Sequence, residues 1–596
     1  MRGSVSCGAA APKGSVTLLD YGAGNVRSVR NAVSRLGYEI VEAKTWQDVA
    51  NADKLLFPGV GAMGQAREAL RASGLDKPLV DYVSAGRPFL GICIGMQVLF
   101  EGSEENGGCE GLGVLPGAVR LLRPRGRLPV PHIGWEKVAV HDAPGSSPSL
   151  LRALDGREVY FVHSYAAEAA ADAASRPSWQ VATCDYGGDF LAAVRLGEAY
   201  ATQFHPEKSG EAGLALLEAF LSSGGDAGKR AADAGKTFDF SAAAFEAAKK
   251  REGEAEASTS SSSSSSSSDA PAIAPYARRI IACLDVRAND AGKLVVTKGD
   301  QYDVREPGSS SGGPSGDVKN LGDPVELAAR YFEEGADEVA FLNITAFRGT
   351  PLGDVPTLDL LERASARVFV PLTIGGGIRA YTDDAGREVS ALEVAGAYFR
   401  AGADKVSIGS DAVYAAEHLR AQGGVPDGTS AIEAISTHYG AQAVVVSVDP
   451  RRVYVADPAD AGGHVVVETD EPGPNGERYA WYQCTVKGGR EGRDVDAVQL
   501  AQAAETLGAG EILLNCIDKD GAKSGFDIPL VKAVADAVTV PVIASSGAGA
   551  PEHFAEVFER TGAAAALAAG IFHRRTVSIG QAKQAVKDAG VPVRIA

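Results

Sequence analysis

The sequence predicts an α/β protein in two parts, an N-terminal domain on a mainly parallel sheet followed by a C-terminal (β/α)8 TIM barrel. Three observations lead to this prediction. The chain has 596 residues, whereas one hydrophobic core stops growing near about 250–300 residues. Residues 258–268 are almost pure serine, and the second half of the chain repeats itself. We therefore expect domains at 14–223 and 276–596, joined by a linker at 224–275.

Composition excludes several classes of protein. The hydrophobic share of 45% and charged share of 22% are typical of globular proteins. No apolar run approaches the roughly 18 residues of a membrane helix. The net charge of −18 argues against nucleic acid or an anionic membrane as a partner. We therefore expect small-molecule substrates.

Cysteine and histidine usage predicts neither disulfides nor a metal. The seven cysteines form no C-x-x-C pair, which is typical of a reducing compartment. The nine histidines lack metal-ligand spacing. The first fourteen residues contain no acid, so they are either the tail of an organelle-targeting segment or a disordered terminus.

Strand-like and helical runs alternate in the N-terminal part. Apolar runs at 15–22, 38–43, 54–60 and 87–93 flank helical patterns at 25–36 and 63–73. This alternation predicts a parallel sheet with helices on both faces. Later runs lie closer together and indicate an added antiparallel portion. The linker composition of 224–275 indicates separate domains, the alternative being a surface insertion within one domain.

Four strand cores recur in the same order in the second part. IIACLDV at 280–286 matches VVVSVDP at 444–450, and three further pairs follow at similar offsets. Two copies of a four-strand half make the eight strands of a barrel. The remaining length falls into a loop around 308–316 and an insertion at 453–492.

The first domain carries a candidate nucleophile and base. Cys93 lies in GICIG directly after a strand, a nucleophile-elbow pattern in which glycines permit the tight turn. His205 and Glu207 in QFHPE suit a base and its orienting carboxylate. The turn PGVGA at 58–62 offers backbone N–H groups to an oxyanion. Each piece alone also suits a structural turn or a packed cysteine.

These motifs resemble those of class I glutamine amidotransferases. GICIGMQ, PGVG and QFHPEKSG carry the likeness, and LLDYGAGN, HIGW and FVHSY narrow it to the glutaminase subunits of imidazole glycerol phosphate synthases. The resemblance implies that Cys93 forms a glutamyl thioester, that His205 protonates the departing ammonia, and that Glu207 holds His205. It places around glutamine the residues Gly59, Val60, Gly61 and Gln97.

Two aspartates are expected in the barrel mouth. Asp285 ends the first predicted strand and Asp449 the fifth, and these strands face each other across an eight-stranded barrel. A carboxylate pair suits general acid/base chemistry, although an aspartate after a strand also caps helices. Glycine-rich turns in each half predict two phosphate sites, because backbone N–H groups there approach an anion closely. The residues expected at these two phosphate sites are Gly377, Gly409, Ser410, Asp520, Gly521, Gly547, Ala569 and Gly570.

Four charged residues begin predicted barrel strands: Arg279, Glu338, Lys405 and Glu511. They would form either a compensated salt-bridge layer on the barrel floor or, as the sequence alone slightly favours, a solvated surface layer.

The second part resembles the cyclase subunits of the same synthases, through RRIIACLDV, TIGGGIR, GADKVSIGS and GAGEILLNCIDKDGAKSG. The resemblance implies that Asp285 and Asp449 are the acid/base pair and that Lys298 lies in a mobile loop. It also implies that the four strand-start residues gate ammonia entry and that Lys208 and Asp404 meet between the domains. The chain departs from the family at Asn343, Gly409 and Ser546.

The expected function is that of the fused family form. Glutamine would yield ammonia in the first domain, and the barrel would use it to convert a phosphoribulosyl-formimino ribonucleotide into imidazole glycerol phosphate and aminoimidazole carboxamide ribonucleotide. No cofactor is expected. The alternatives are an isomerase barrel and a glutamine-sensing scaffold. A monomer is expected, in the plastid stroma or alternatively the cytoplasm.

Overall fold

The computed structural model describes residues 11–22, 24–141, 149–168, 180–223, 276–288, 294–297, 320–344, 355–383 and 385–595. Four sequence-based expectations lie wholly or largely outside these residues: the N-terminal segment 1–14, the linker at 224–275, Lys298 and the loop around 308–316. Within the described ranges no helix combines the length and apolarity needed to cross a membrane.

The N-terminal domain is built on an eight-stranded sheet in the order β2-β1-β3-β4-β14-β13-β12-β9. Strands β2 to β14 in this order pair in parallel, and the last three continue the sheet antiparallel. The expected mixed sheet is therefore confirmed. The strands are β1 Ser15–Leu19, β2 Glu39–Ala43, β3 Leu55–Gly59, β4 Phe89–Cys93, β9 Ala139–His141, β12 Gln180–Asp185, β13 Asp189–Leu196 and β14 Ala199–Thr202.

Helices cover both faces of this sheet. One buried cluster includes Val29 of α1 and Leu216 of α6. A second cluster includes Leu70 of α3 and Tyr82 of α4. Helix α1 begins where the Asn25 side chain accepts the Ser28 N–H group. The helices are α1 Val26–Arg35, α2 Trp46–Asn51, α3 Met63–Ala72, α4 Asp76–Ser84, α5 Ile94–Gln97 and α6 Gly210–Ser222.

Two smaller sheets complete the N-terminal domain. Strands β8 (His132–Lys137) and β10 (Glu158–His163) form an antiparallel ribbon. Trp135 and Tyr160 of this ribbon join the hydrophobic cluster of the C-terminal domain, whereas Phe161 joins that of its own domain. The ribbon therefore lies between the two domains. The second sheet has the order β11-β7-β5-β6, with β11 Tyr165–Ala167, β7 Ala118–Leu121, β5 Gly102–Ser103 and β6 Cys109–Glu110.

The C-terminal domain is a closed barrel of parallel strands. Consecutive pairs follow the chain order, and β15 pairs with β29 to close the ring. The predicted TIM barrel is thus confirmed. Its strands are β15 Arg279–Ala288, β17 Glu338–Asn343, β18 Leu372–Gly375, β21 Lys405–Ile408, β22 Val444–Val448, β27 Glu511–Asn515, β28 Val542–Ser545 and β29 Ala565–Ala568.

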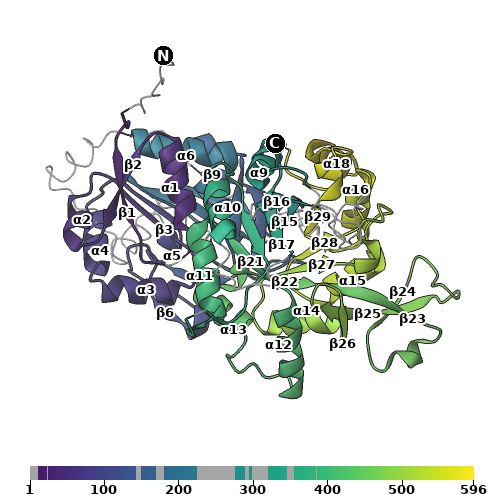
Figure 1. Cartoon of the computed structure of the whole chain (residues 1–596). Coiled ribbons are helices and arrows are strands. Elements are labelled where there is room, and N and C mark those ends of the chain that lie inside the picture. The colour runs from purple at the N-terminus through teal and green to yellow at the C-terminus, as the bar shows by residue number, and fades with distance from the viewer. Residues whose placement is uncertain are drawn as a thin grey trace, which may run out of the picture.

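The barrel helices surround these strands (Figure 1). Four of them begin at capping boxes, in which the cap side chain and the third helical residue satisfy each other's free N–H groups, at Ser390, Ser430, Asp496 and Ser578. The helices are α9 Pro324–Glu333, α10 Val355–Ser365, α11 Ala391–Ala401, α12 Ser410–Ala421, α13 Ala431–Tyr439, α14 Ala497–Thr506, α15 Ile528–Ala537, α16 Glu552–Arg560, α17 Gly570–His573 and α18 Ile579–Asp588.

Two elements interrupt the regular barrel. Strand β15 continues beyond Asp285 to Ala288, because its last residues pair antiparallel with β16 (Leu294–Val296). The expectation that Asp285 ends its strand was therefore wrong by three residues. The insertion expected at 453–492 forms an antiparallel sheet of β23 Pro450–Val455, β24 Val466–Glu468, β25 Tyr479–Val486 and β26 Glu491–Asp496. In Figure 1 strands β23, β24 and β25 project on the side away from the purple N-terminal domain.

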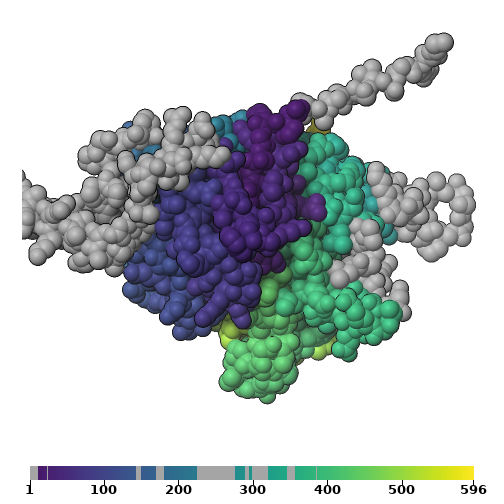
Figure 2. Space-filling view, turned by 90° about the vertical axis from the view of Figure 1, so that its left-hand side faces the viewer, coloured from purple at the N-terminus to yellow at the C-terminus, as the bar shows by residue number. Residues whose placement is uncertain are grey.

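The N-terminal domain packs against the amino ends of the barrel strands. Trp135 donates its indole N–H to the carbonyl of Asp337, which precedes β17, at 3.2 Å. Asn25 donates to the carbonyl of Gly402, shortly before β21, at 2.9 Å. Figure 2 shows the purple and blue N-terminal domain in front, with green barrel surface adjoining it. The carboxyl ends of the strands, where barrel chemistry lies, are consequently left free of this contact.

Candidate active sites

Cys93 occupies a strained turn between β4 and α5. Its φ is 54° and its ψ is −104°, a region rarely visited by a residue with a side chain. Gly95 permits the turn, since a Cβ at this position would lie 1.9 Å from the Phe57 carbonyl oxygen. This strand-turn-helix geometry is that of a nucleophile elbow. Cys93 itself is buried, with 4% of its surface exposed.

His205 and Glu207 form a buried pair beside Cys93. His205 Nδ1 lies 2.8 Å from Glu207 Oε1, and the His205 amide donates to the Tyr160 carbonyl at 3.0 Å. Burial on its own lowers the pKa of His205, but the Glu207 carboxylate and the Cys93 sulfur outweigh it and raise the pKa well above its usual value. This arrangement suits Cys93 as a nucleophile, His205 as its base and Glu207 as the carboxylate that orients the base.

Two glutamines connect the Cys93 sulfur to the neighbouring sheet. Gln203 Nε2 lies 3.5 Å from Cys93 Sγ. Gln97 Nε2 donates to Gln203 Oε1 at 3.0 Å and to the Tyr165 carbonyl at 2.9 Å. Gln97 is therefore linked to Cys93 by hydrogen bonds that run through Gln203. Gln203 was missed in the sequence, because it lies in the bend after β14 and its partner Cys93 is 110 positions away.

The loop after β3 lies at the same site. The Val60 carbonyl accepts the Tyr21 hydroxyl at 2.7 Å, and Gly61 takes a φ of +109°. A Cβ at Gly61 would meet the carbonyl oxygen of His438, a residue of barrel helix α13, at 3.1 Å. Strand pairing brings Gly59 opposite Cys93. The glycine-rich turn thus lies between the Cys93 elbow and the barrel.

In the barrel, Asp285 lies in β15 and Asp449 directly follows β22, the strand opposite β15. Strand β15 is four positions from β22 in either direction around the ring. Asp449 Oδ1 accepts hydrogen bonds from Asn515 Nδ2 at 2.7 Å and Ser447 Oγ at 3.2 Å. Burial raises the pKa of Asp449, and these two hydrogen bonds oppose that effect. Asp285 lies 3.9 Å from the Cys283 thiol.

The predicted phosphate-binding residues gather in two groups at the carboxyl ends of neighbouring strands. Gly377 follows β18, and Gly409 and Ser410 join β21 to α12. Gly547 follows β28, Ala569 and Gly570 join β29 to α17, and Asp520 and Gly521 follow β27. The two groups lie on opposite sides of the ring. A Cβ at Gly547 would lie 2.1 Å from the Gly525 carbonyl oxygen, so no other residue fits there.

The four charged strand-start residues meet as a closed ring of ion pairs. Arg279 contacts Glu338 at 2.9 Å and also pairs with Glu511. Lys405 contacts Glu338 at 2.8 Å and Glu511 at 2.6 Å. Each residue is at most 1% exposed. The solvated surface layer that the sequence slightly favoured is therefore not what forms, because opposite charges compensate one another in the interior.

Residues of the N-terminal domain lie next to this ring. The buried Tyr160 hydroxyl has no hydrogen-bond partner in the described ranges, and the Glu338, Arg279 and Glu511 charges act on its pKa, which burial raises. Lys208 lies 2.7 Å from Asp404, which also accepts from Asn25 at 2.8 Å. The ring thus lies between the barrel interior and the domain that carries Cys93.

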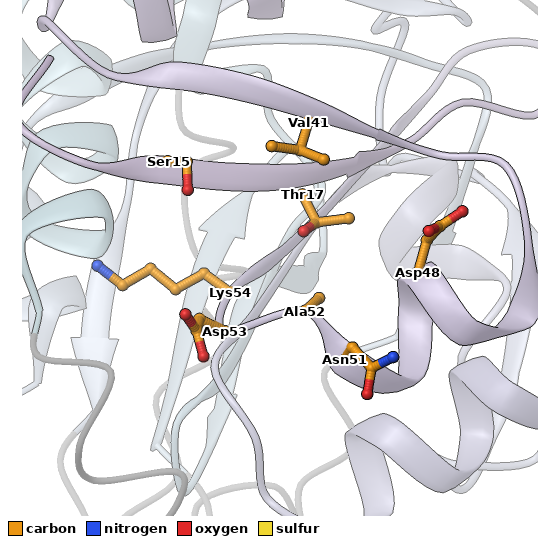
Figure 3. A pocket seen from close by; sticks show the side chains of 8 residues that line it. All are labelled: Ser15, Thr17, Val41, Asp48, Asn51, Ala52, Asp53 and Lys54. Atoms are coloured by element: carbon orange, nitrogen blue, oxygen red, sulfur yellow. The ribbon is translucent and has the colours of Figure 1, made fainter.

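A surface pocket of about 260 Å³ is separate from both sites (Figure 3). Ser15 and Thr17 of β1 line it together with Lys54, which immediately precedes β3. These positions lie at the amino ends of parallel strands, whereas Cys93 lies at the carboxyl end of β4. Within the described ranges, no group of three or more His, Cys, Asp or Glu residues is placed so that it could hold a metal ion.

Comparisons with known proteins agree with this two-site arrangement. Residues 17–223 match the family described as glutamine amidotransferase class-I, and residues 279–578 match the histidine biosynthesis protein family. A relative in Arabidopsis thaliana, imidazole glycerol phosphate synthase hisHF, chloroplastic, is 52% identical over 97% of this chain and 89% of its own length. The hisHF synthase of Schizosaccharomyces pombe is 50% identical over 97% of this chain and 99% of its own.

The chain belongs to the imidazole glycerol phosphate synthase hisHF family. Its barrel alone also matches a separate subunit, HisF of Natronomonas pharaonis, at 43% identity over 53% of this chain and 98% of that subunit. The chain therefore joins in one polypeptide a glutamine amidotransferase and a histidine-biosynthesis barrel, as the sequence predicted.

The three departures from the family pattern have distinct environments. Asn343 donates to the Thr357 hydroxyl at 3.2 Å. A Cβ at Gly409 would meet no atom of the described residues within 4 Å, so there is room for a side chain at this position. Ser546 takes a φ of +73°, a left-handed conformation that glycine adopts more readily than serine.

Proposed function

We propose that this synthase hydrolyses glutamine at Cys93 and uses the ammonia in the barrel, where Asp285 and Asp449 convert the formimino ribonucleotide into imidazole glycerol phosphate and aminoimidazole carboxamide ribonucleotide. The observation that carries the proposal is the ion-pair ring between a Cys-His-Glu site and an opposed aspartate pair. We propose domain limits of 14–223 and 276–596 with 224–275 as linker.

In the amidotransferase domain, the Cys93 thiol loses its proton to His205 and its sulfur attacks the carboxamide carbon of glutamine. Glu207 stabilises the protonated imidazole at 2.8 Å. His205 then gives the proton to the departing nitrogen, so that ammonia leaves and a thioester remains for water to hydrolyse. Backbone N–H groups of the loop Gly59, Val60 and Gly61 stabilise the oxyanion, and Gln97 orders the site through Gln203.

In the barrel, the two phosphate groups of the substrate bind at the two groups of strand-end glycines. Backbone N–H groups hold them, which suits a protein with net charge −18. The substrate then lies across the mouth between Asp285 and Asp449, which exchange protons with it during cyclisation and cleavage. From the family resemblance we also propose Lys298, which lies outside the described residues, as a loop residue of this site.

Ammonia passes between the sites through the ring of Arg279, Glu338, Lys405 and Glu511, and Lys208 with Asp404 holds the domains in register. Ring burial and the location at the domain contact support this path. We also propose a monomer in the plastid stroma, since the Arabidopsis relative is named chloroplastic; the cytoplasm is the alternative.

Replacing the nucleophile tests the two-site arrangement. Cys93→Ala should abolish glutamine-dependent turnover while ammonium salts still support imidazole product formation, because only the group that releases ammonia is removed. Both reactions are followed by product analysis with the ribonucleotide as substrate. Loss of the ammonium-dependent reaction as well would contradict the proposal.

Replacing the barrel aspartates tests the second site. Asp285→Asn and Asp449→Asn should each lower turnover by at least about 10²-fold with either nitrogen source, since an amide keeps the shape but exchanges no proton. Ammonium-dependent turnover measured at saturating ribonucleotide checks this. Near-normal rates in both variants would leave the aspartates as structural caps.

A further inference from the structure

The antiparallel sheet β23–β26, inserted after the fifth barrel strand, is firmly fixed to the barrel. Asp527, which caps α15, receives the Arg452 guanidinium of β23 at 2.6 Å and the Tyr482 hydroxyl of β25 at 2.8 Å. Tyr482 and Asp527 are both 2% exposed. A buried charged hydrogen-bonded pair of this kind tolerates little displacement, because either partner alone would be left uncompensated. The sheet therefore moves with the barrel wall.

Thr485 of β25 holds the main chain at Asp449. Its amide donates to the Asp449 carbonyl at 3.1 Å and its hydroxyl donates to the same oxygen at 2.7 Å. Thr485 is 4% exposed. Asp449 thus has its carbonyl bound twice by the inserted sheet, while its carboxylate is bound by Asn515 and Ser447 of the barrel. Between them the two sets of donors fix both the backbone and the side chain of this aspartate.

The sheet also contacts both predicted phosphate regions. At the end of β25 the Lys487 amide donates to Ser410 Oγ at 3.0 Å. Lys487 has a φ of 57°, so the backbone accepts an unfavourable conformation at this contact. On the other side, Glu471 lies 3.1 Å from Lys519, which directly precedes Asp520. One small sheet therefore touches the aspartate and each phosphate region.

We propose that the sheet β23–β26 is a positioning element of the cyclase site and that Thr485 is the positioning residue through which it fixes Asp449. This inference rests on the proposed role of Asp449. The physical reason is geometric. Asp449 lies where the chain leaves the barrel strand β22 and turns outward into β23. The backbone pairing of β23 with β25 begins only at Pro450, opposite Cys484. The Thr485 hydroxyl adds to it a side-chain hydrogen bond to the Asp449 carbonyl itself.

The consequence for catalysis follows from the sensitivity of proton transfer to position. Displacements near 1 Å from the productive geometry cost up to about 10²-fold in rate. A small backbone shift at Asp449 would also lengthen the hydrogen bonds from Asn515 and Ser447, which favour the charged carboxylate. The limb of the pH–rate profile that Asp449 sets would then move to higher pH, an effect that general loss of stability does not produce.

The test compares Thr485→Val with Thr485→Ser, using ammonium salts as the nitrogen source so that Cys93 takes no part. The valine variant lacks the hydroxyl, and we expect its kcat to fall roughly 3- to 10-fold with KM for the ribonucleotide changed by less than about 2-fold. The limb of its pH–rate profile that Asp449 sets should move to higher pH. The serine variant keeps the donor and should restore both kcat and the pH profile.

A matched control is Thr506→Val. The Thr506 hydroxyl also donates to a backbone carbonyl, that of Gln502 at 2.9 Å, but on the exposed end of α14. The control should behave as wild type. If the valine variant does not fold, Thr485→Ala is compared with Thr485→Ser. Both variants lack the γ-methyl group of threonine and they differ only in the hydroxyl, so the comparison still isolates the hydrogen bond.

Two results would overturn the inference. One is a Thr485→Val protein whose kcat and pH profile match those of Thr506→Val. The other is a serine variant as impaired as the valine variant. If Asp449→Asn is itself nearly fully active, the proposed function fails instead. If Asp449→Asn is inactive while Thr485→Val is normal, only the positioning role is lost.

Discussion

At the scale of single residues, two buried histidines link pH to the stability of the amidotransferase domain. His132 and His163 are opposite each other on the ribbon of β8 and β10, and both are at most 2% exposed. Burial lowers the pKa of His163 to about 3 and that of His132 well below its usual value. Both imidazoles are therefore neutral in the folded protein across the physiological range.

Acid should consequently destabilise the fold through these residues. Below its ordinary pKa the unfolded chain binds a proton at His163 that the folded chain does not bind. The stability that neutral His163 allows is therefore fully present above the ordinary histidine pKa, and it is lost as the pH falls below that value. From about pH 7.5 to about pH 5 each such histidine should cost about 2 kcal/mol of unfolding free energy. Urea unfolding of wild type and His163→Phe at the two pH values measures the difference.

The phenylalanine variant should lose less stability between the two pH values than wild type. His141→Phe serves as the control, because His141 is exposed and should leave the pH dependence unchanged. Equal acid sensitivity in wild type and His163→Phe would show that His163 does not remain neutral in the folded chain.

At the scale of elements, the sequence predicted most of what positions the sites. The repeated strand cores marked eight parallel strands, and the alternation of strands and helices marked the first sheet, because both patterns are local and periodic. The elbow around Cys93 could also be predicted, since its glycines are demanded by the turn itself. Long-range pairing was harder: β15 extends past Asp285 only because β16 folds back on it.

The same limit explains which site residues were missed. Gln203, Asn515 and Thr485 act through partners 110, 66 and 36 positions away. No spacing rule connects such positions before the register of the strands is known. The charged ring posed a related problem. Four charges at strand starts suit either solvent or a buried layer, and their mutual pairing across the barrel could not be predicted before the strand order was known.

At the scale of the whole molecule, the fold places the two sites at opposite ends of one barrel axis. The glycine turn at Gly61 touches the carbonyl region of His438, and Gln65 donates to the Thr437 carbonyl at 3.0 Å, so the Cys93 site and helix α13 share a contact. The barrel mouth, with Asp449, lies at the other ends of the strands. On the proposed function, ammonia would cross the barrel floor, where the ion-pair ring lies.

Lys405 is the most informative position in that ring. Its ammonium group contacts both glutamates, so removing it leaves these two buried carboxylates with Arg279 as the one cation that pairs with them in the described ranges. Lys405→Ala should change the ratio of ammonia escaping into solution to imidazole product formed, while Cys93 continues to hydrolyse glutamine. Glutamate, free ammonia and imidazole glycerol phosphate measured in one reaction give this ratio.

Lys405→Met, which keeps most of the side-chain volume, separates loss of charge from loss of packing, and Lys532→Ala on the exposed face of α15 is the control. Because an uncompensated buried charge is costly, thermal unfolding of each variant accompanies the assay. An unchanged ratio in folded Lys405→Ala and Lys405→Met would mean that ammonia does not pass through the ring.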